Sequence, residues 1–236
     1  MGNFDKKIEV FIDYFINHDG YKTVLLGLKN TAYIAVLGLL IGIVIGTIIA
    51  TVRVLPKTNP VVKFFNGVCS LYVSLFRGTP IVVQLLVFYY VLLPLMDIRI
   101  NSVAVAVIVF GMNSGAYISE IMRAGILSVD SGQMEGGRAI GLSYSTTMMK
   151  IVIPQAIKNI LPTLGNEFIA LIKETSVVSF VGATDLYVAF NRIGSNSYEF
   201  MVPYLVMALI YIVIVFVISM AIKVMERSLR KSDKSI

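Results

Sequence analysis

The chain has 236 residues, of which 57% are hydrophobic and only 14% are charged, whereas typical soluble domains carry about 25% charged residues. This balance indicates a lipid environment. Its net charge of +6 does not indicate a nucleic-acid-binding protein, because the basic residues gather at the ends of apolar runs, as in membrane proteins.

Residues Met1 to Lys22 mix acidic and basic residues with aromatic ones, and we expect an amphipathic segment at the outer membrane surface, without a cleavable signal. Asn30 to Val52 holds 23 uncharged residues, enough for a spanning helix. Three glycines recur on one face of this helix at four-residue spacing, which lets a second helix approach closely. They are Gly38, Gly42 and Gly46.

The next connection carries four basic residues: Arg53, Lys57, Lys63 and Arg77. An apolar stripe within it predicts a helix that lies along the membrane interface. The stripe consists of Val61, Phe64, Phe65, Val68, Leu71, Tyr72 and Leu75. A second span is predicted from Thr79 to Met96, with Pro80 in its first turn, and a third from Ile100 to Ser119. Two roles remain open for Arg77: a positive anchor at a helix start, or a gate or interface residue.

Ser128 to Pro154 is the longest polar interruption of the chain. Asp130 can cap a short helix, with Gln133 reaching back to it as in a capping box. Gly141 stands where such a helix would end, and Ser143 can cap the next one. We therefore predict a compact knob of two short helices.

Phe200 to Ile222 holds 23 uncharged residues and predicts the last span. The stretch from Ile160 to Thr184 contains three charged residues, so its hydropathy alone is ambiguous. Thirteen of the 20 Lys and Arg residues fall on the basic connection, the knob region and the tail, if these lie inside. The positive-inside rule then requires the ambiguous stretch to cross. The prediction is an all-α protein with five transmembrane helices, the N-terminus outside and the C-terminus cytoplasmic.

A crossing at 160–184 puts Glu167, Lys173 and Glu174 at membrane depth, where an uncompensated charge costs at least about 2.5–3.5 kcal/mol. Two alternatives remain open, a structural ion pair between helices or a polar pocket for a zwitterionic or cationic amino acid. In the pocket alternative, Glu167 and Lys173 are joined by residues of the second and third spans. These are Gln84, Asn113, Tyr117 and Glu120.

The knob resembles the EAA loop of ABC-importer permease subunits, whose pattern is Glu-Ala-Ala, a Gly six residues after the Glu, and Ile-x-Leu-Pro. Here Gly136-Gly137 follows Glu135 in place of Ala-Ala, Gly141 is in register, and Ile151 to Pro154 closes the pattern with Ile for Leu. Three further stretches match the polar amino-acid branch, which serves histidine, glutamine and arginine. They are Phe76 to Pro80 with Gln84, Asn113 to Tyr117 running into Glu120 and Arg123 to Gly125, and Asn166-Glu167 through Lys173 to Ser176.

This resemblance, which covers about 23–225, implies the five-span fold of type I importer permeases in the inner (cytoplasmic) membrane. The expected parts are an extracytoplasmic segment (1–22), the transmembrane domain (23–225) with its coupling loop (about 128–154), and a basic cytoplasmic tail (226–236). Expected partners are two ATP-binding cassette subunits carrying ATP and Mg²⁺, a second permease copy or paralogue, an extracytoplasmic solute-binding protein and a polar amino acid, but no nucleic acid. The ATPase-coupling residues implied are Glu135, Gly136, Gly137, Arg138, Ala139 and Gly141.

The sequence also bears on whether the chain is itself an ATPase, a self-sufficient transporter or an enzyme. The chain has no Gly-x-x-x-x-Gly-Lys-Ser/Thr motif, so ATP hydrolysis is expected on a separate subunit. A self-sufficient secondary transporter or channel is the alternative, but it predicts inverted repeats that are not evident. With one Cys (Cys69) and one His (His18), the chain offers no disulfide framework, metal site or Cys–His pair, which argues against a membrane enzyme; Cys69 reads as a packing residue.

Overall fold

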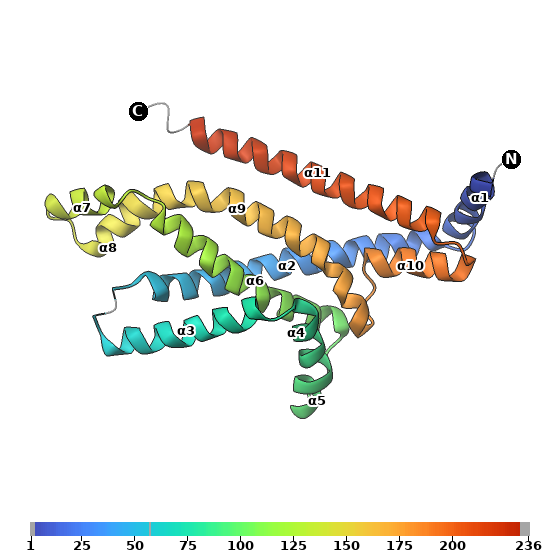
Figure 1. Cartoon of the computed structure of the whole chain (residues 1–236), viewed down its shortest axis with the longest axis horizontal. Coiled ribbons are helices and arrows are strands. Elements are labelled where there is room, and N and C mark those ends of the chain that lie inside the picture. The colour runs from blue at the N-terminus through green and yellow to red at the C-terminus, as the bar shows by residue number, and fades with distance from the viewer. Residues whose placement is uncertain (1–2, 57, 232–236) are drawn as a thin grey trace.

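The computed structural model describes residues 3–56 and 58–231, and throughout this part the chain forms helices and turns without a strand, as predicted. In chain order the elements are α1 (Asn3–Ile16), α2 (Gly20–Val54), α3 (Pro60–Gly78), α4 (Ile81–Val87), η1 (Phe88–Leu92), α5 (Leu93–Leu95), α6 (Ser102–Leu127), α7 (Ser131–Ala139), α8 (Tyr144–Thr147), η2 (Met148–Val152), α9 (Ile153–Glu174), η3 (Thr175–Val181), α10 (Leu186–Ser197) and α11 (Met201–Lys231). The molecule is elongated, with α1 and α10 at one end and α7 and α8 at the other (Figure 1).

The most extensive helix contact among the described residues joins α2 to α6, and the predicted glycine face of α2 takes part in it. Gly38, Gly42 and Gly46 are all buried, and a Cβ atom on Gly42 would lie 2.8 Å from the hydroxyl of Ser114. The fit is reciprocal, because a Cβ on Gly111 of α6 would lie 2.5 Å from a side-chain carbon of Ile41. Small residues on both helices thus bring the two backbones together, as expected where lipid supplies no hydrophobic drive for association.

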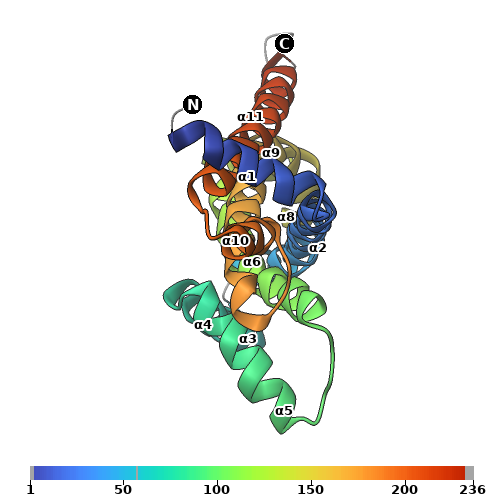
Figure 2. The same cartoon turned by 90° about the vertical axis from the view of Figure 1, so that its right-hand side faces the viewer.

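A sharp corner separates α3 from the short helical arm that follows it. The axes of α3 and of Ile81–Leu95 differ by 106°, and the arm formed by α4 and α5 extends away from the other helices (Figure 2). The predicted span from Thr79 to Met96 corresponds to Ile81–Leu95, and the predicted interfacial helix corresponds to α3, the other half of this bent pair.

Most of the apolar stripe predicted for α3 is exposed, Phe64 at 68% and Leu71 at 69%. Tyr72 was wrongly placed on that stripe. Its hydroxyl donates to the carbonyl oxygen of Met112 at 2.6 Å, so this side chain turns inward toward α6. Cys69 packs beside it against an apolar cluster, as a packing residue should.

Two π-helical turns, η1 and η2, end just before a Leu-Pro or Ile-Pro pair. Pro94 follows η1 and Pro154 follows η2 by two residues. A proline ring collides with the carbonyl four residues earlier in an α-helix and cannot donate a hydrogen bond to it. The wider π turn relieves this collision while the helix continues, and one such turn connects the polar region of α7 and α8 to α9.

The second half of the chain differs from the prediction in its boundaries and in one added helix. The predicted crossing at 160–184 consists of α9, which begins at Ile153, and a 3₁₀ extension, η3. The sequence analysis missed α10, whose start is capped by the buried Asp185 through the amide of Val188 at 2.9 Å. Helix α11 continues to Lys231, so the first part of the predicted tail (226–236) is helical and 232–236 lies outside the described residues.

Three described helices, α2, α6 and α11, are long and apolar enough to cross a membrane, and the bent pair of α3 with α4 and α5 makes a fourth candidate. Helix α9 is absent from this set although it is 22 residues long, and it contains four charged residues: Lys158, Glu167, Lys173 and Glu174.

Candidate functional site

The knob at one end of the molecule is built as predicted from local hydrogen bonds. The carboxylate of Asp130 accepts from the amide of Gly132 at 2.6 Å and caps α7, while the hydroxyl of Ser143 accepts from the amide of Thr146 at 3.1 Å and caps α8. Gly141 adopts the left-handed conformation, with φ of 88°, at the end of α7. Each helix start and the turn between them is thus fixed without help from the rest of the chain.

The turn that ends α7 is a Schellman motif. The amide of Gly141 donates to the carbonyl of Arg138, and the amide of Leu142 donates to that of Gly137, both at 3.1 Å. Only the left-handed residue makes both bonds possible, which explains the glycine. One detail was wrong: the side-chain oxygen of Gln133 accepts from the amide group of Gln155 at 3.3 Å and does not reach back to Asp130.

The two glycines in place of Ala-Ala have different surroundings. Gly137 is buried, and a Cβ atom there would lie 2.5 Å from the methyl carbon of Thr147 in α8. Gly136 is exposed, and a Cβ atom there would have no neighbour within 4 Å. The close approach of α7 to α8 therefore depends on Gly137 alone.

The outer surface of the knob combines charged and apolar side chains. Glu135 and Arg138 are exposed and form no ion pair with each other in the described part of the chain. Ile140, between them and the turn, is 78% exposed. Ala139 and Gly141 are exposed as well. A rigid protrusion with an uncovered apolar residue has the character of a docking surface.

The predicted pocket residues fall into four separate places. Gln84 and Asn113 hold the corner between α3 and α4. The amide nitrogen of Gln84 donates to the carbonyl oxygens of Phe76 at 2.8 Å and Thr79 at 3.0 Å, and its oxygen accepts from Asn113 at 2.9 Å. Both side chains are buried, so in this structure they stabilise the bend by hydrogen bonds and expose little surface to a ligand.

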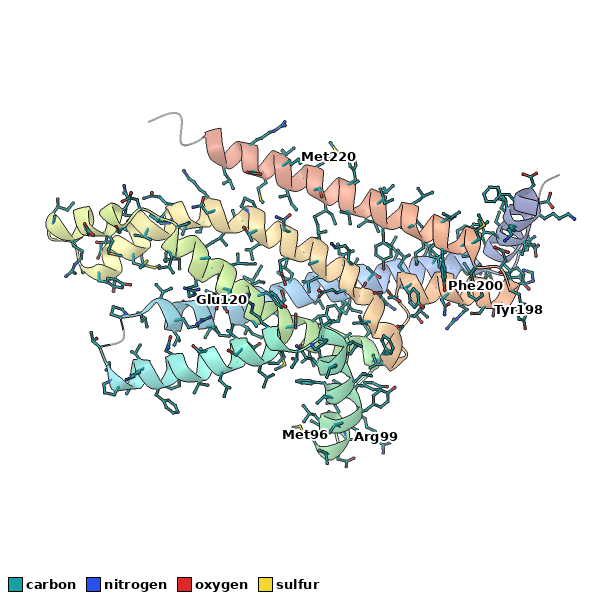
Figure 3. The ribbon with its side chains drawn as sticks, in the orientation of Figure 1. Met96, Arg99, Glu120, Tyr198, Phe200 and Met220 are labelled. Atoms are coloured by element: carbon teal, nitrogen blue, oxygen red, sulfur yellow. The ribbon has the colours of Figure 1, made fainter. Side chains whose placement is uncertain are left out.

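Glu120, which is labelled on its helix in Figure 3, belongs to a cluster. Its one carboxylate meets guanidinium groups from three helices. It pairs with Arg53 of α2 and with Arg123 at 2.9 Å, and Arg77 of α3 lies 4.0 Å away. The guanidinium of Arg77 also lies over the ring of Tyr117, 5.4 Å from its centre. Arg77 therefore contacts two side chains of α6, Glu120 and Tyr117. With three guanidinium groups around one carboxylate, the cluster has a net positive charge.

Glu167 faces α6 and accepts a hydrogen bond from the buried hydroxyl of Ser114 at 3.1 Å. No cation among the described residues lies within ion-pair distance of it. Lys173 is on another side of α9 and borders a groove with Tyr211 and Phe216 of α11. Within the described residues the ion pair considered between Glu167 and Lys173 is thus not formed, and the groove at Lys173 does not include Glu167.

Two partners in these contacts were missed by the sequence analysis. Ser114 and Arg53 carry no signal of their own, since a serine in an apolar helix and an arginine at a helix end are common. Their contacts are made by chain segments far apart, 53 residues for Ser114 with Glu167 and 67 for Arg53 with Glu120.

The molecule combines long apolar helices, a polar contact between α6 and α9 at Ser114 and Glu167, and a rigid protrusion at one end. These are the features of a membrane transport subunit. Over residues 38–231 the chain matches the family described as "Binding-protein-dependent transport system inner membrane component". The chain belongs to this family and is a multi-pass membrane permease subunit of an ABC import system.

Individual relatives agree with this assignment. The arginine transport system permease protein ArtQ of Bacillus subtilis (strain 168) is 38% identical over 169 residues, which cover 72% of this chain and 77% of ArtQ. The L-cystine transport system permease protein TcyB of the same organism is 41% identical over 169 residues, 71% of this chain and 72% of TcyB. A crystal structure of an amino acid ABC transporter with histidines superposes with a TM-score of 0.83 at 36% identity, covering 92% of this chain and 98% of that one.

Proposed function

We propose that this chain is the membrane-spanning subunit through which an ATP-driven importer moves a polar, or polar and cationic, amino acid into the cytoplasm. The observation that carries the proposal is the rigid knob, in which Glu135, Gly141 and Pro154 keep the spacing of a coupling loop on two capped helices. Relatives named for arginine and cystine transport support the amino-acid substrate. No relative or solved structure reported above favours a self-sufficient secondary transporter or channel.

The knob docks on a cytoplasmic ATPase subunit in this proposal, and two such subunits bind ATP and Mg²⁺ outside this chain. The docking residues are Glu135, Gly136, Gly137, Arg138, Ala139 and Gly141. All but Gly137 are exposed, while Gly137 holds α7 against α8, which supports a protrusion that transmits force without bending. A second permease copy or a paralogue and an extracytoplasmic solute-binding protein complete the assembly.

The orientation proposed is five spans, with the N-terminus outside and the knob inside. The separation of α1 from α7 and α8 along the long axis supports this arrangement (Figure 1). A cysteine at Ser195, exposed on α10, should react with a membrane-impermeant thiol reagent applied outside. A cysteine at Ser235, outside the described residues, should react only from the cytoplasmic side. The reverse pattern would contradict the orientation.

The amino acid is bound at membrane depth by Glu167 in this proposal. Its carboxylate is held by one hydroxyl and by no cation of the described chain, so it has capacity left for an ammonium or guanidinium group. Lys173, Gln84 and Asn113 take no part in this proposed binding, because Lys173 borders another groove and the two amides bond within the α3–α4 corner.

The experiment that tests the function is substrate-stimulated ATP hydrolysis. The chain is purified with its partner subunits and binding protein, reconstituted in liposomes, and assayed with each of the twenty amino acids. Stimulation together with uptake by one or a few polar amino acids is the expected result. Uptake that does not depend on ATP, or no response to any amino acid, would overturn the proposal.

A further inference from the structure

An open groove of about 420 Å³ lies between α6 and α9, on the side of Glu167 that faces the knob. Its lining surface is mostly apolar, with the Glu120 carboxylate and the polar side chains of Ser128, Asn159 and Thr163 set into it. The other lining residues are Ile121, Ala124 and Gly125. None of these residues takes part in the binding proposed at Glu167.

The groove continues the line of the Glu167 side chain along α9. Thr163 and Asn159 precede Glu167 by four and eight residues, so all three share one face of the helix. On α6, Glu120 follows Ser114 by six residues, about 9 Å along the helix axis. A polar track therefore leads from the Glu167–Ser114 contact toward the knob end, between the same two helices.

The two carboxylates on this track differ in how their charge is compensated. Glu167 has only the Ser114 hydroxyl, whereas Glu120 pairs with Arg53 and Arg123 and has Arg77 4.0 Å away. A cationic or zwitterionic amino acid meets an uncompensated carboxylate at the first position. At the second it meets a carboxylate whose charge is already compensated by Arg53 and Arg123, which do not themselves line the groove, so the attraction is weaker there.

We propose that the groove lined by Glu120, Asn159 and Thr163 is a release site, which the transported amino acid occupies with lower affinity after it leaves Glu167. The inference rests on the proposed function and adds to it a second position for the same substrate. Lower affinity at this second position favours release of the amino acid from the protein, since a site that binds tightly would hold it inside the membrane.

The groove can be narrowed at Thr163 without changing Glu120 or the arginines that pair with it. Thr163 is exposed, and its hydroxyl makes only a bond of 3.3 Å to the carbonyl of Asn159 in its own helix. Thr163→Leu should therefore block the groove at small cost to the fold. Thr47→Leu is a control, because Thr47 is also exposed and donates to the carbonyl of Ile43 in its own helix, with one further contact of 3.4 Å to the sulfur of Met122, and lies on α2 outside the groove.

In the reconstituted complex, Thr163→Leu should lower the maximal rate of uptake at least about fivefold. The substrate concentration that half-stimulates ATP hydrolysis should stay unchanged, because the site at Glu167 is intact. Uptake by Thr163→Leu at the rate of Thr47→Leu would overturn the release site.

A second measurement decides the matter if Thr163→Leu fails to fold. In a Cys69→Ser background, Thr163→Cys should react with a membrane-impermeant thiol reagent added to the cytoplasmic face, and millimolar amounts of the imported amino acid should slow that reaction. Labelling of Thr47→Cys should not respond to the amino acid. If the wild type imports an amino acid but gives Thr163→Cys no protection, only the release site is wrong. If the wild type imports none, the proposed function is wrong and the release site falls with it.

Discussion

The knob and the seam between α6 and α9 are both polar regions of an apolar chain, yet they are assembled in opposite ways. In the knob, each bond that sets the caps and the turn joins residues at most five positions apart, such as Leu142 with Gly137. In the seam, Ser114 and Glu167 are 53 residues apart, and their meeting depends on how α2, α6 and α9 pack. The knob should therefore keep its structure when residues elsewhere are substituted. The contact between α6 and α9 can be changed by substitutions far from it that shift the packing of the helices.

This contrast predicts that the knob tolerates changes that leave its internal bonds intact but not changes on its docking surface. Glu135→Lys should abolish uptake and the coupling of ATP hydrolysis to substrate, because it reverses the charge of an exposed residue. Thermal stability should stay near that of the wild type, since Glu135 has no ion-pair partner within the described chain. Uptake and thermal unfolding of the purified complex measure both effects.

A matched control for Glu135→Lys is Ser131→Lys, a change at another exposed residue of α7. It should retain most of the uptake. Full uptake by Glu135→Lys at equal expression would show that the knob does not couple through this face.

The seam is expected to respond through substrate affinity. Glu167→Gln keeps an acceptor for Ser114 but removes the charge, so affinity for a cationic amino acid should fall roughly ten- to a hundredfold, as for the loss of one charge-assisted hydrogen bond. Titration of substrate-stimulated ATP hydrolysis measures the shift.

Lys173→Met added to Glu167→Gln discriminates the binding role from an ion pair. Because the two side chains lie on different sides of α9, the second change should restore neither affinity nor stability. Restoration of stability by Lys173→Met would favour the ion pair and argue against a substrate role for Glu167.

The two glycines of the knob give a sharper test of its local design. Gly137→Ala should reduce uptake several-fold, because the new methyl group would lie 2.5 Å from Thr147 and push α7 away from α8. Gly136→Ala meets no neighbour within 4 Å, and it should stabilise α7 by about 1 kcal/mol through helix propensity. Uptake and thermal stability are measured for both variants. Gly137→Ala should lower thermal stability and Gly136→Ala should raise it, and equal behaviour of the two would contradict the packing of α7 on α8.

The smallest effect is expected at a long-range contact outside both regions. Lys7 of α1 pairs with Glu199 before α11 at 3.0 Å, at the end of the molecule where Tyr198 and Phe200 lie (Figure 3). The Lys7 ammonium holds the pKa of Glu199 below its usual value of 4.5. A lowered carboxyl pKa stabilises the contact at and above pH 4.5, and this contribution is lost as the pH falls through the lowered pKa.

A spin label at Ile12→Cys, in a Cys69→Ser background, reports on this contact. Its mobility should rise as the pH falls below 4.5, and Glu199→Gln should remove that dependence. Unchanged mobility of the label in the otherwise unaltered protein would show that the pair does not hold α1 in place.

The elements whose signals are local could be predicted from the residues alone. Long uncharged runs predicted α2 and α11 because lipid requires them, and the cap and turn residues Asp130, Gly141 and Ser143 predicted the knob because their bonds reach only a few residues. The glycine face of α2 also predicted a close helix contact, although not that α6 supplies the other side.

Which polar side chains meet became known from the packed structure. It placed Gln84 and Asn113 in the α3–α4 corner, surrounded Glu120 with arginines, and separated Lys173 from Glu167. These arrangements depend on the rotation of each helix about its axis and on the 106° bend, which follow from packing between helices distant in sequence. Residue spacing fixes which side chains share a helix face, but the neighbour that each face meets is set by the packed molecule as a whole.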